Sequence, residues 1–211
     1  MDFPTHLRIG GLLYTWIQQT YLVRLHKAAF LYGCIEPDYE HLFEAAKNLK
    51  GHHCYEDSLK DVLKMYEDLP PVGGDRFSFQ LGRLCHYLMD FSCFPHTEMS
   101  SMSPLAHILY EKQMGMEAIL FSRKLFYKSL DELPACNSRA VPDMIQYIHE
   151  KYRQYCQFGK KGRQMQMAYD VSFACISCAT VIAAYLDYCS VPVLPIEQPI
   201  KALPAAMFSI F

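Results

Sequence analysis

Apolar residues recur at helical spacing along almost the whole of this 211-residue chain. In the first segment, Leu13, Ile17, Tyr21 and Leu25 follow one another at intervals of four residues. This spacing places the four side chains on one face of a helix. No run of alternating apolar and polar residues is long enough to predict a strand. The sequence therefore predicts an all-α fold.

Prolines and glycines divide this pattern into separate helices. The proline-free segment over 5–32 predicts one long helix that ends near Gly33, and the run PPVGG over 70–74 predicts a turn. Further helices are predicted over residues 40–49, 58–69, 77–90, 103–120 with an extension toward Leu130, 141–158 and 163–188.

The length is that of a single domain, because one hydrophobic core usually spans ~100–200 residues. We expect residues 1–190 to form one all-α domain. Residues 191–211 hold four prolines among apolar side chains, and we expect an extended tail that docks on the helices or on a partner. The most apolar stretch, 171–186, is shorter than the ~20 residues of a membrane span, so a buried core helix is expected there.

The net charge and the cysteine content indicate which partners and which cellular location to expect for the protein. Twenty basic and 22 acidic residues give a formal net charge of −2, so no broad positive surface for duplex nucleic acid is expected. The nine cysteines are an odd number with one Cys-x-x-Cys pair, at Cys175 and Cys178, and they do not predict a disulfide framework. Because no signal peptide is legible, we expect a cytoplasmic location.

Histidines are concentrated in the first part of the chain, where eight of the nine precede residue 110. His86 has Asp90 four residues later, and His107 has Glu111. This spacing places each pair on one helix face, where it can bind a metal ion or form a simple surface ion pair. Asp90 lies on a strongly apolar helix, and burial of an unpartnered acid is costly, so a metal ion or a basic group is expected beside it.

The order of these residues resembles that of a known family. The segment GCIEPD over 33–38 precedes His52 and His53, and LGRLCHYLMDFSCFPH over 81–96 precedes HILYE over 107–111. A His-x-x-x-Asp pair, a histidine six residues after that aspartate, and then a His-x-x-x-Glu pair resemble the zinc-dependent phospholipase C family, which is related to the S1/P1 nucleases. The resemblance covers about residues 6–111 and implies a multi-helix bundle of the phospholipase C and P1 nuclease type.

The resemblance also implies a cluster of two or three Zn²⁺ ions that hydrolyses phosphodiesters, with Asp38 and Asp90 as catalytic carboxylates. The implied ligands are Asp38, His52 or His53, His86 and Asp90 for one ion; His96, His107 and Glu111 for a second; and His6, Asp90 and the amino group and carbonyl of Met1 for a third.

The implied chemistry agrees with the residue types. Zinc binds imidazole nitrogens and carboxylate oxygens, and a catalytic zinc keeps a position for water. The metal lowers the pKa of that water toward ~7 and stabilises charge at phosphorus. We therefore expect metal-bound hydroxide to attack the phosphorus of a phospholipid or a related phosphodiester, with peripheral membrane contact as a further expectation.

Two other functions are kept as alternatives. A single-strand nuclease would use the same metals, although the near-neutral charge and Glu111, where nucleases commonly have aspartate, favour it less. A helical binding module would hold structural zinc or none. The sequence leaves open whether His52 or His53 is the ligand and whether two or three ions bind.

Other residues near the expected ligands offer alternatives for the ligand set. His41 lies three residues after Asp38 and is more simply an exposed helix residue. Cys34, Cys85 and Cys93 flank expected ligands, and a cysteine can replace a missing zinc ligand.

Overall fold

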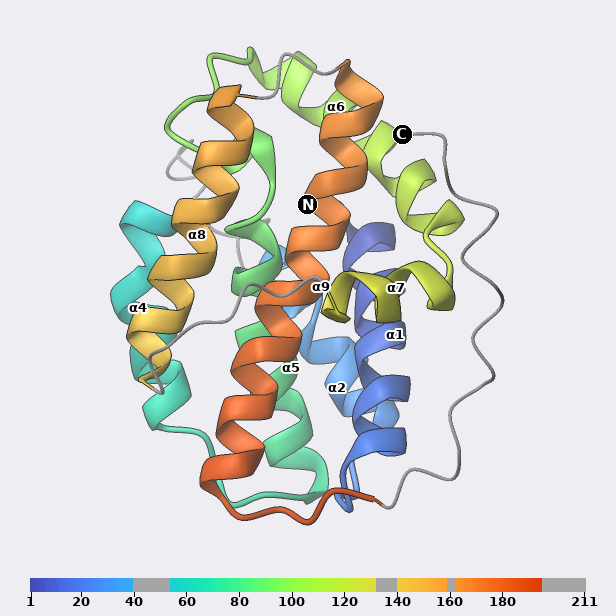
Figure 1. Cartoon of the computed structure of the whole chain (residues 1–211), viewed down its shortest axis with the longest axis vertical. Helices are drawn as coiled ribbons and strands as arrows, with labels where there is room; N and C mark the ends of the chain where they lie inside the picture. Colours follow the sequence, from blue (N-terminus) through green and yellow to red (C-terminus); the bar gives the residue numbers. More distant parts are fainter. Residues whose placement is uncertain (40–53, 132–139, 159–161, 195–211) are drawn as a thin grey trace.

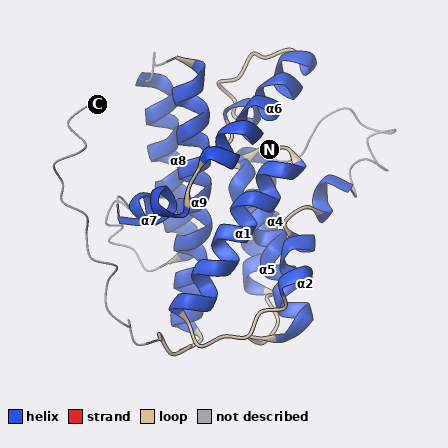
Figure 2. Cartoon of the chain, turned by 90° about the vertical axis from the view of Figure 1, so that its right-hand side faces the viewer, coloured by secondary structure: helices blue, strands red, loops and turns tan. Residues whose placement is uncertain are grey.

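The computed structural model describes residues 1–39, 54–131, 140–158 and 162–194, and over these residues it confirms the predicted all-α fold (Figure 1). No strand occurs in these ranges, and Figure 2 shows a bundle of helices joined by loops. The helices are α1 (Phe3–Thr20), α2 (Lys27–Gly33), α4 (Tyr55–Glu67), α5 (Gly74–Asp90), the 3₁₀ turn η1 (Phe94–His96), α6 (Pro104–Leu120), α7 (Arg123–Asp131), α8 (Val141–Phe158) and α9 (Arg163–Tyr188).

Helix α9 runs through the bundle and packs against α5, α6, α7 and α8 (Figure 1). Ala174, Cys178 and Ile182 on this helix have no exposed surface or almost none. Within the described ranges, α9 is the one helix whose length and composition would suffice to cross a membrane, yet 61% of its apolar window is buried against the other helices. This burial agrees with the core helix that the sequence predicts.

The single helix predicted over 5–32 is wrong, because the structure divides it into α1 and α2. Tyr21 follows α1 with extended dihedral angles (φ −121°, ψ 143°). The backbone N–H of Leu22 then donates to the carbonyl of Pro192 at 2.7 Å. Since this partner lies far along the chain, helical periodicity does not reveal the interruption.

The predicted extension of helix 103–120 toward Leu130 is interrupted in the same way. Phe121 ends α6 with an extended backbone. The guanidinium of Arg8 donates to the carbonyls of Ala118 (3.3 Å) and Phe121 (3.1 Å), which satisfies acceptors that a helix end leaves without intrahelical partners. Helix α7 then crosses the bundle in a new direction (Figure 1).

Helices α2 and α5 touch backbone to backbone at Gly33 and Gly82. A Cβ atom at Gly33 would lie 2.2 Å from the carbonyl oxygen of Phe79, and one at Gly82 would lie 2.2 Å from that of Phe30. Only glycine allows so close an approach. The contact holds the chain that follows α2, which carries Asp38, against α5.

Several predictions concern residues outside the described ranges. These are the helix over 40–49, the positions of His41, His52 and His53, and the tail from residue 195 onward. The division into a domain over 1–190 and a tail over 191–211 stays a prediction.

Candidate metal centre

Seven of the nine side chains expected as metal ligands lie in the described ranges, and the structure brings these seven together. They come from different helices and from the segments that join them. His6 is on α1, Asp38 follows α2, His86 and Asp90 are on α5, His96 ends η1, and His107 and Glu111 are on α6.

Asp90 lies at the centre of this group. Its Oδ1 is 3.4 Å from Nε2 of His6. Its Oδ2 is 3.4 Å from Nε2 of His86 and 3.9 Å from Nδ1 of His96. The amino group of Met1 also donates to Oδ1. A carboxylate with imidazoles beside both of its oxygens would be one of the residues that hold metal ions here.

His86 is oriented by the backbone. Its Nδ1 lies 3.0 Å from the carbonyl oxygen of Cys34, and because a carbonyl only accepts, Nδ1 carries the proton. In the neutral ring Nε2 then presents its lone pair, and it faces Asp90 and, at 3.7 Å, Oδ1 of Asp38. A histidine that ligates a metal has this tautomer and this kind of outer hydrogen bond.

The buried side chain of His6 shows whether a metal ion would fit the site. The side chain is fully buried, and neither ring nitrogen has a hydrogen-bond partner within the described part of the chain. Its ring stacks on that of His86, with the centroids 4.1 Å apart. Buried polar atoms without partners are costly, and a cation between these imidazoles and Asp90 would remove the cost. Zinc fits, because imidazole nitrogen and carboxylate oxygen are among its preferred donors.

Glu111 joins two further histidines. Its Oε1 accepts from Nε2 of His96 at 2.9 Å and from Nε2 of His107 at 3.0 Å, and it lies 3.2 Å from the amino nitrogen of Met1. The thiol of Cys93 belongs to the same neighbourhood, since Sγ and donor atoms of His96 and Glu111 all lie within 4.8 Å of one another. This second group of donors differs from the first, which consists of His6, Asp38 and His86. Asp90 lies near histidines of both groups.

The centre has a sealed floor and an open mouth. The side chains of His6, His86 and Asp90 form the floor and have no exposed surface. At the mouth, the side chain of Asp38 is 31% exposed and that of His107 is 34% exposed. The donor cluster is thus accessible to solvent at Asp38 and His107 and inaccessible to it at His6, His86 and Asp90.

Burial and charge act in opposite directions on the two central acids. Burial raises the pKa of Asp90, but the amino group of Met1 and the neighbouring imidazoles outweigh it, so the pKa lies well below its usual range. Burial also raises the pKa of Glu111, yet the same amino group and the hydrogen bonds from His107 and His96 lower it overall. Both carboxylates are thus ionised, as metal ligands must be.

Imidazoles and carboxylates that converge inside a helical bundle define the class of this protein, an all-α protein whose buried donor set suits zinc. Within this class, the family model of zinc-dependent phospholipase C matches residues 5–161. The chain therefore belongs to the zinc-dependent phospholipase C family, which confirms the family that the ligand order predicts. No curated protein and no solved structure matches the chain. The role of each residue as a ligand stays a prediction, and His52 and His53 lie outside the described ranges.

Asp170 on α9 was not among the expected site residues. It is fully buried, and its two oxygens accept four hydrogen bonds. The donors are the N–H of Phe94 (3.0 Å), the hydroxyls of Tyr110 (2.8 Å) and Tyr152 (2.7 Å), and the amide of Gln166 (2.8 Å). The sequence signal was an aspartate beside the most apolar stretch, but it did not reveal the donors.

Asp170 is expected to make the stability depend on pH. Burial raises its pKa to about 6, although the four hydrogen bonds lower it. The pKa of an unfolded aspartate is about 3.9, so the folded chain binds the extra proton between about pH 4 and about pH 6, and stability falls as the pH rises through this interval. We expect this group to lower the free energy of unfolding by about 3 kcal/mol between about pH 4 and about pH 7.

Urea unfolding of the wild type and of Asp170→Asn at a series of pH values measures this contribution. The variant is expected to lose this part of the pH dependence, while the other titrating groups affect both chains alike. A difference in stability between the two chains that is the same at every pH would contradict the prediction.

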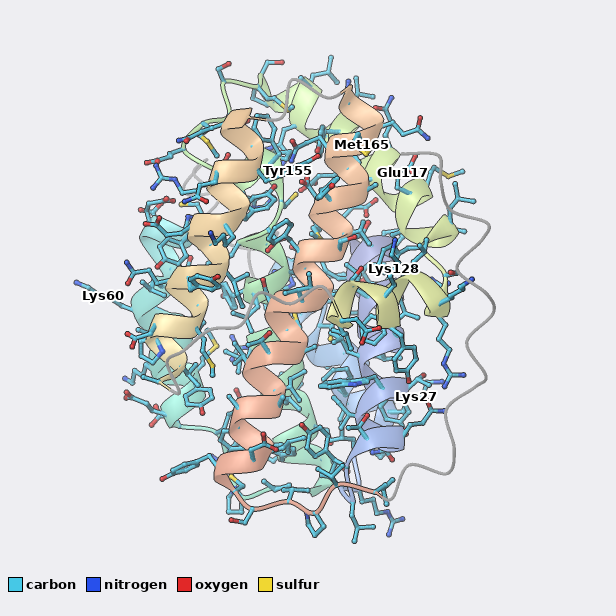
Figure 3. All side chains as sticks on the ribbon, in the orientation of Figure 1. Lys27, Lys60, Glu117, Lys128, Tyr155 and Met165 are labelled. Carbon is cyan, nitrogen blue, oxygen red and sulfur yellow. The ribbon has the colours of Figure 1, made fainter. Side chains whose placement is uncertain are left out.

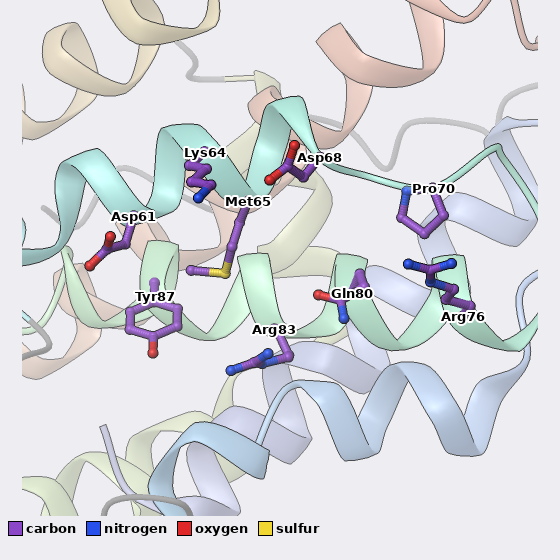
Figure 4. A pocket seen from close by; sticks show the side chains of 9 residues that line it. All are labelled: Asp61, Lys64, Met65, Asp68, Pro70, Arg76, Gln80, Arg83 and Tyr87. Carbon is purple, nitrogen blue, oxygen red and sulfur yellow. The ribbon is translucent and has the colours of Figure 1, made fainter.

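A polar groove of about 440 Å³ lies between α4 and α5, away from the expected ligands (Figure 4). Lys64 lines it from α4, and Arg76 and Arg83 line it from α5. Arg83 also pairs with Glu36, with 2.8 Å between Nε and Oε2. None of the seven described ligand candidates lines the groove, so it is separate from the metal centre.

Proposed function

We propose that the chain is a zinc-dependent phosphodiester hydrolase of the phospholipase C type, acting on phospholipids. The observation that carries the proposal is the convergence of four imidazoles and three carboxylates on a centre with a sealed floor and an open mouth. When bound there, zinc lowers the pKa of water and stabilises negative charge on a phosphoryl group.

Two zinc ions suit the two groups of donors. The residues that would hold them are His6, Asp38 and His86 for one ion, His96, His107 and Glu111 for the other, and Asp90 between the two. The amino nitrogen of Met1 lies beside Asp90 and Glu111, so a third ion would add this group. We propose two ions as the minimum set.

Three residues of the centre have distinct tasks in this proposal. Asp38 combines partial exposure with a position 3.7 Å from His86, which suits a carboxylate that accepts a proton from water. Asp90 has no exposed surface, and it orients the imidazoles around it. His107 is the most exposed of these imidazoles, which supports a position for it on the side from which a phosphate enters.

An exposed apolar face on α6 favours a phospholipid over an oligonucleotide. Large apolar side chains on this helix are 48–69% exposed. They are Leu105, Ile108, Leu109, Met116, Ile119 and Leu120. The same helix carries His107 and Glu111 on another of its sides. A lipid surface that contacts the apolar face would therefore lie beside the helix that carries two of the proposed ligands.

Cationic side chains accompany the apolar face. Lys112 on α6 and Arg123, Lys124 and Lys128 on α7 are exposed, and Figure 3 labels Lys128 on α7. Exposed apolar side chains in combination with cations are typical of proteins that bind the surface of an anionic membrane. We therefore propose a lipid surface as the partner of this face.

The proposed activity is tested with zinc-loaded protein and two substrates. Vesicles of phosphatidylcholine report phospholipase activity through release of phosphocholine, and a single-stranded oligonucleotide reports nuclease activity. Release of phosphocholine would support the proposal. Cleavage of the oligonucleotide alone would favour the nuclease, and stoichiometric zinc without hydrolysis of either substrate would favour the non-catalytic module.

Replacement of Ile119 by glutamate is expected to weaken binding to vesicles that contain phosphatidylserine by about 10-fold or more, because the variant loses the transfer of one large apolar side chain from water. Turnover of a soluble short-chain phosphocholine ester is expected to stay unchanged, since Ile119 is 60% exposed and is none of the proposed ligands. Cosedimentation measures the binding.

Leu22→Glu is the matched control for this experiment. Leu22 is 65% exposed, and it follows α1 at the opposite end from His6. The control is expected to bind vesicles as the wild type does. Equal binding by the Ile119 variant and the control would show that α6 does not contact the lipid surface.

A further inference from the structure

The carboxylate of Asp170 connects elements that carry proposed ligands. Its Oδ2 accepts from the backbone N–H of Phe94 at 3.0 Å and from the hydroxyl of Tyr110 at 2.8 Å. Phe94 begins η1, which ends at His96, and Tyr110 directly precedes Glu111 on α6. One oxygen atom of Asp170 thus connects the segment that carries His96 with the segment that carries Glu111.

The second oxygen of the Asp170 carboxylate accepts hydrogen bonds from α8 and α9, and these hold the carboxylate in place. Its Oδ1 accepts from the hydroxyl of Tyr152 on α8 at 2.7 Å and from the amide of Gln166 on α9 at 2.8 Å. Tyr110, Tyr152 and Asp170 are all buried. Because both oxygens are occupied, Asp170 cannot rotate without breaking hydrogen bonds in a site that excludes water.

The segment most dependent on this support is η1. It has three residues, so it gains little from hydrogen bonds within a helix. Its imidazole, His96, must nevertheless lie 2.9 Å from Glu111. The hydrogen bond that the backbone N–H of Phe94 donates to Asp170 fixes where η1 begins relative to α6.

We infer that Asp170 is a positioning residue of the zinc centre, which sets the distance between His96 and Glu111 although it contacts neither. The inference rests on the zinc centre of the proposed function. Asp170 lies outside residues 5–161, the part that matches the family model, so α9 would contribute to the centre from beyond the matched segment. Outer groups that orient metal ligands typically change metal affinity by about 10–100-fold when they are removed.

The test compares two tyrosine variants that each remove one hydroxyl donor to Asp170. Tyr110→Phe removes the bond on the side of the metal ligands, and Tyr152→Phe removes the bond on the side of α8. Both side chains are fully or almost fully buried, at 1% and 0% exposure. Zinc dissociation constants are measured by competition with a chromogenic chelator, and the absorption spectra of the Co²⁺-loaded proteins report ligand geometry. Neither measurement requires turnover.

Tyr110→Phe is expected to weaken zinc binding by about 10-fold and to change the cobalt spectrum, and Asp170→Asn is expected to weaken it by about 10–100-fold. Tyr152→Phe is expected to retain the wild-type affinity and spectrum, because Gln166 still donates to Oδ1 and the bonds to Oδ2 are unchanged, even where the variant lowers the thermal stability as much as Tyr110→Phe does. Equal zinc affinities for the two tyrosine variants would overturn the inference.

The outcomes also separate this inference from the proposed function. A wild-type chain that binds zinc but hydrolyses no phosphodiester would contradict the function and leave the comparison of affinities valid. A wild-type chain that binds no zinc would overturn the inference together with the centre.

Discussion

The Asp90→Asn variant is expected to lose stoichiometric zinc and to hydrolyse phospholipid more than about 100-fold more slowly than the wild type, since loss of even an outer-shell group costs about 10–100-fold. Asp90 faces His6, His86 and His96 at 3.4–3.9 Å. The amide has nearly the same shape but carries no charge, so the variant removes the negative charge at the middle of the donor cluster and changes little volume. Elemental analysis and the phosphocholine assay measure the two losses.

Asp75→Asn provides the control for Asp90→Asn. Asp75 is in the first turn of the same helix, α5, and its side chain is 79% exposed. This variant is expected to keep the zinc content and the activity of the wild type. If Asp90→Asn also kept both, Asp90 would not be a ligand and the proposed centre would have to be abandoned.

Gly82→Ala is expected to lower the free energy of unfolding by about 3 kcal/mol, at the upper end of the usual cost of overpacking. The added Cβ would lie 2.2 Å from the carbonyl oxygen of Phe30 and 3.0 Å from the backbone nitrogen of Cys34. Both are backbone atoms, so α2 must move away from α5. The carbonyl of Cys34 accepts from His86, and the variant is therefore also expected to bind zinc more weakly.

Gly11→Ala is the matched control, because a Cβ at Gly11 on α1 would have no atom within 4 Å. Alanine is favoured over glycine in a helix by about 0.5–1 kcal/mol, so this variant is expected to be slightly more stable than the wild type. Urea unfolding monitored by circular dichroism compares the three chains. A Gly82→Ala variant as stable as the wild type would mean that α2 and α5 can separate without cost.

The sequence predicted which side chains are neighbours on one helix. A spacing of four residues places His86 and Asp90 on one face of a helix, and their nearest atoms are 3.4 Å apart in the structure. The same spacing brings His107 within 3.0 Å of Glu111. Helix geometry alone fixes such neighbours, so these pairs required no knowledge of the tertiary fold. For the same reason the long periodic stretches of α8 and α9 were predicted with the bounds that the structure gives.

The features that the sequence did not predict depend on partners far along the chain. The donors to Asp170 at Phe94 and Tyr110 are 76 and 60 residues away. The interruption after α1 follows from a bond between Leu22 and Pro192. Periodicity describes each helix by itself, and it contains no information on which distant backbone group will satisfy a given donor or acceptor.

The contrast between floor and mouth implies two rates of metal exchange. His6 on α1 and His86 and Asp90 on α5 have no exposed side-chain surface, so the inner part of the centre opens only when the surrounding helices move apart, at the free-energy cost of local unfolding. Asp38 and His107 meet solvent directly, and exchange there needs no such opening. The slower process would determine how long the protein keeps its metal after the surrounding medium has run out of zinc.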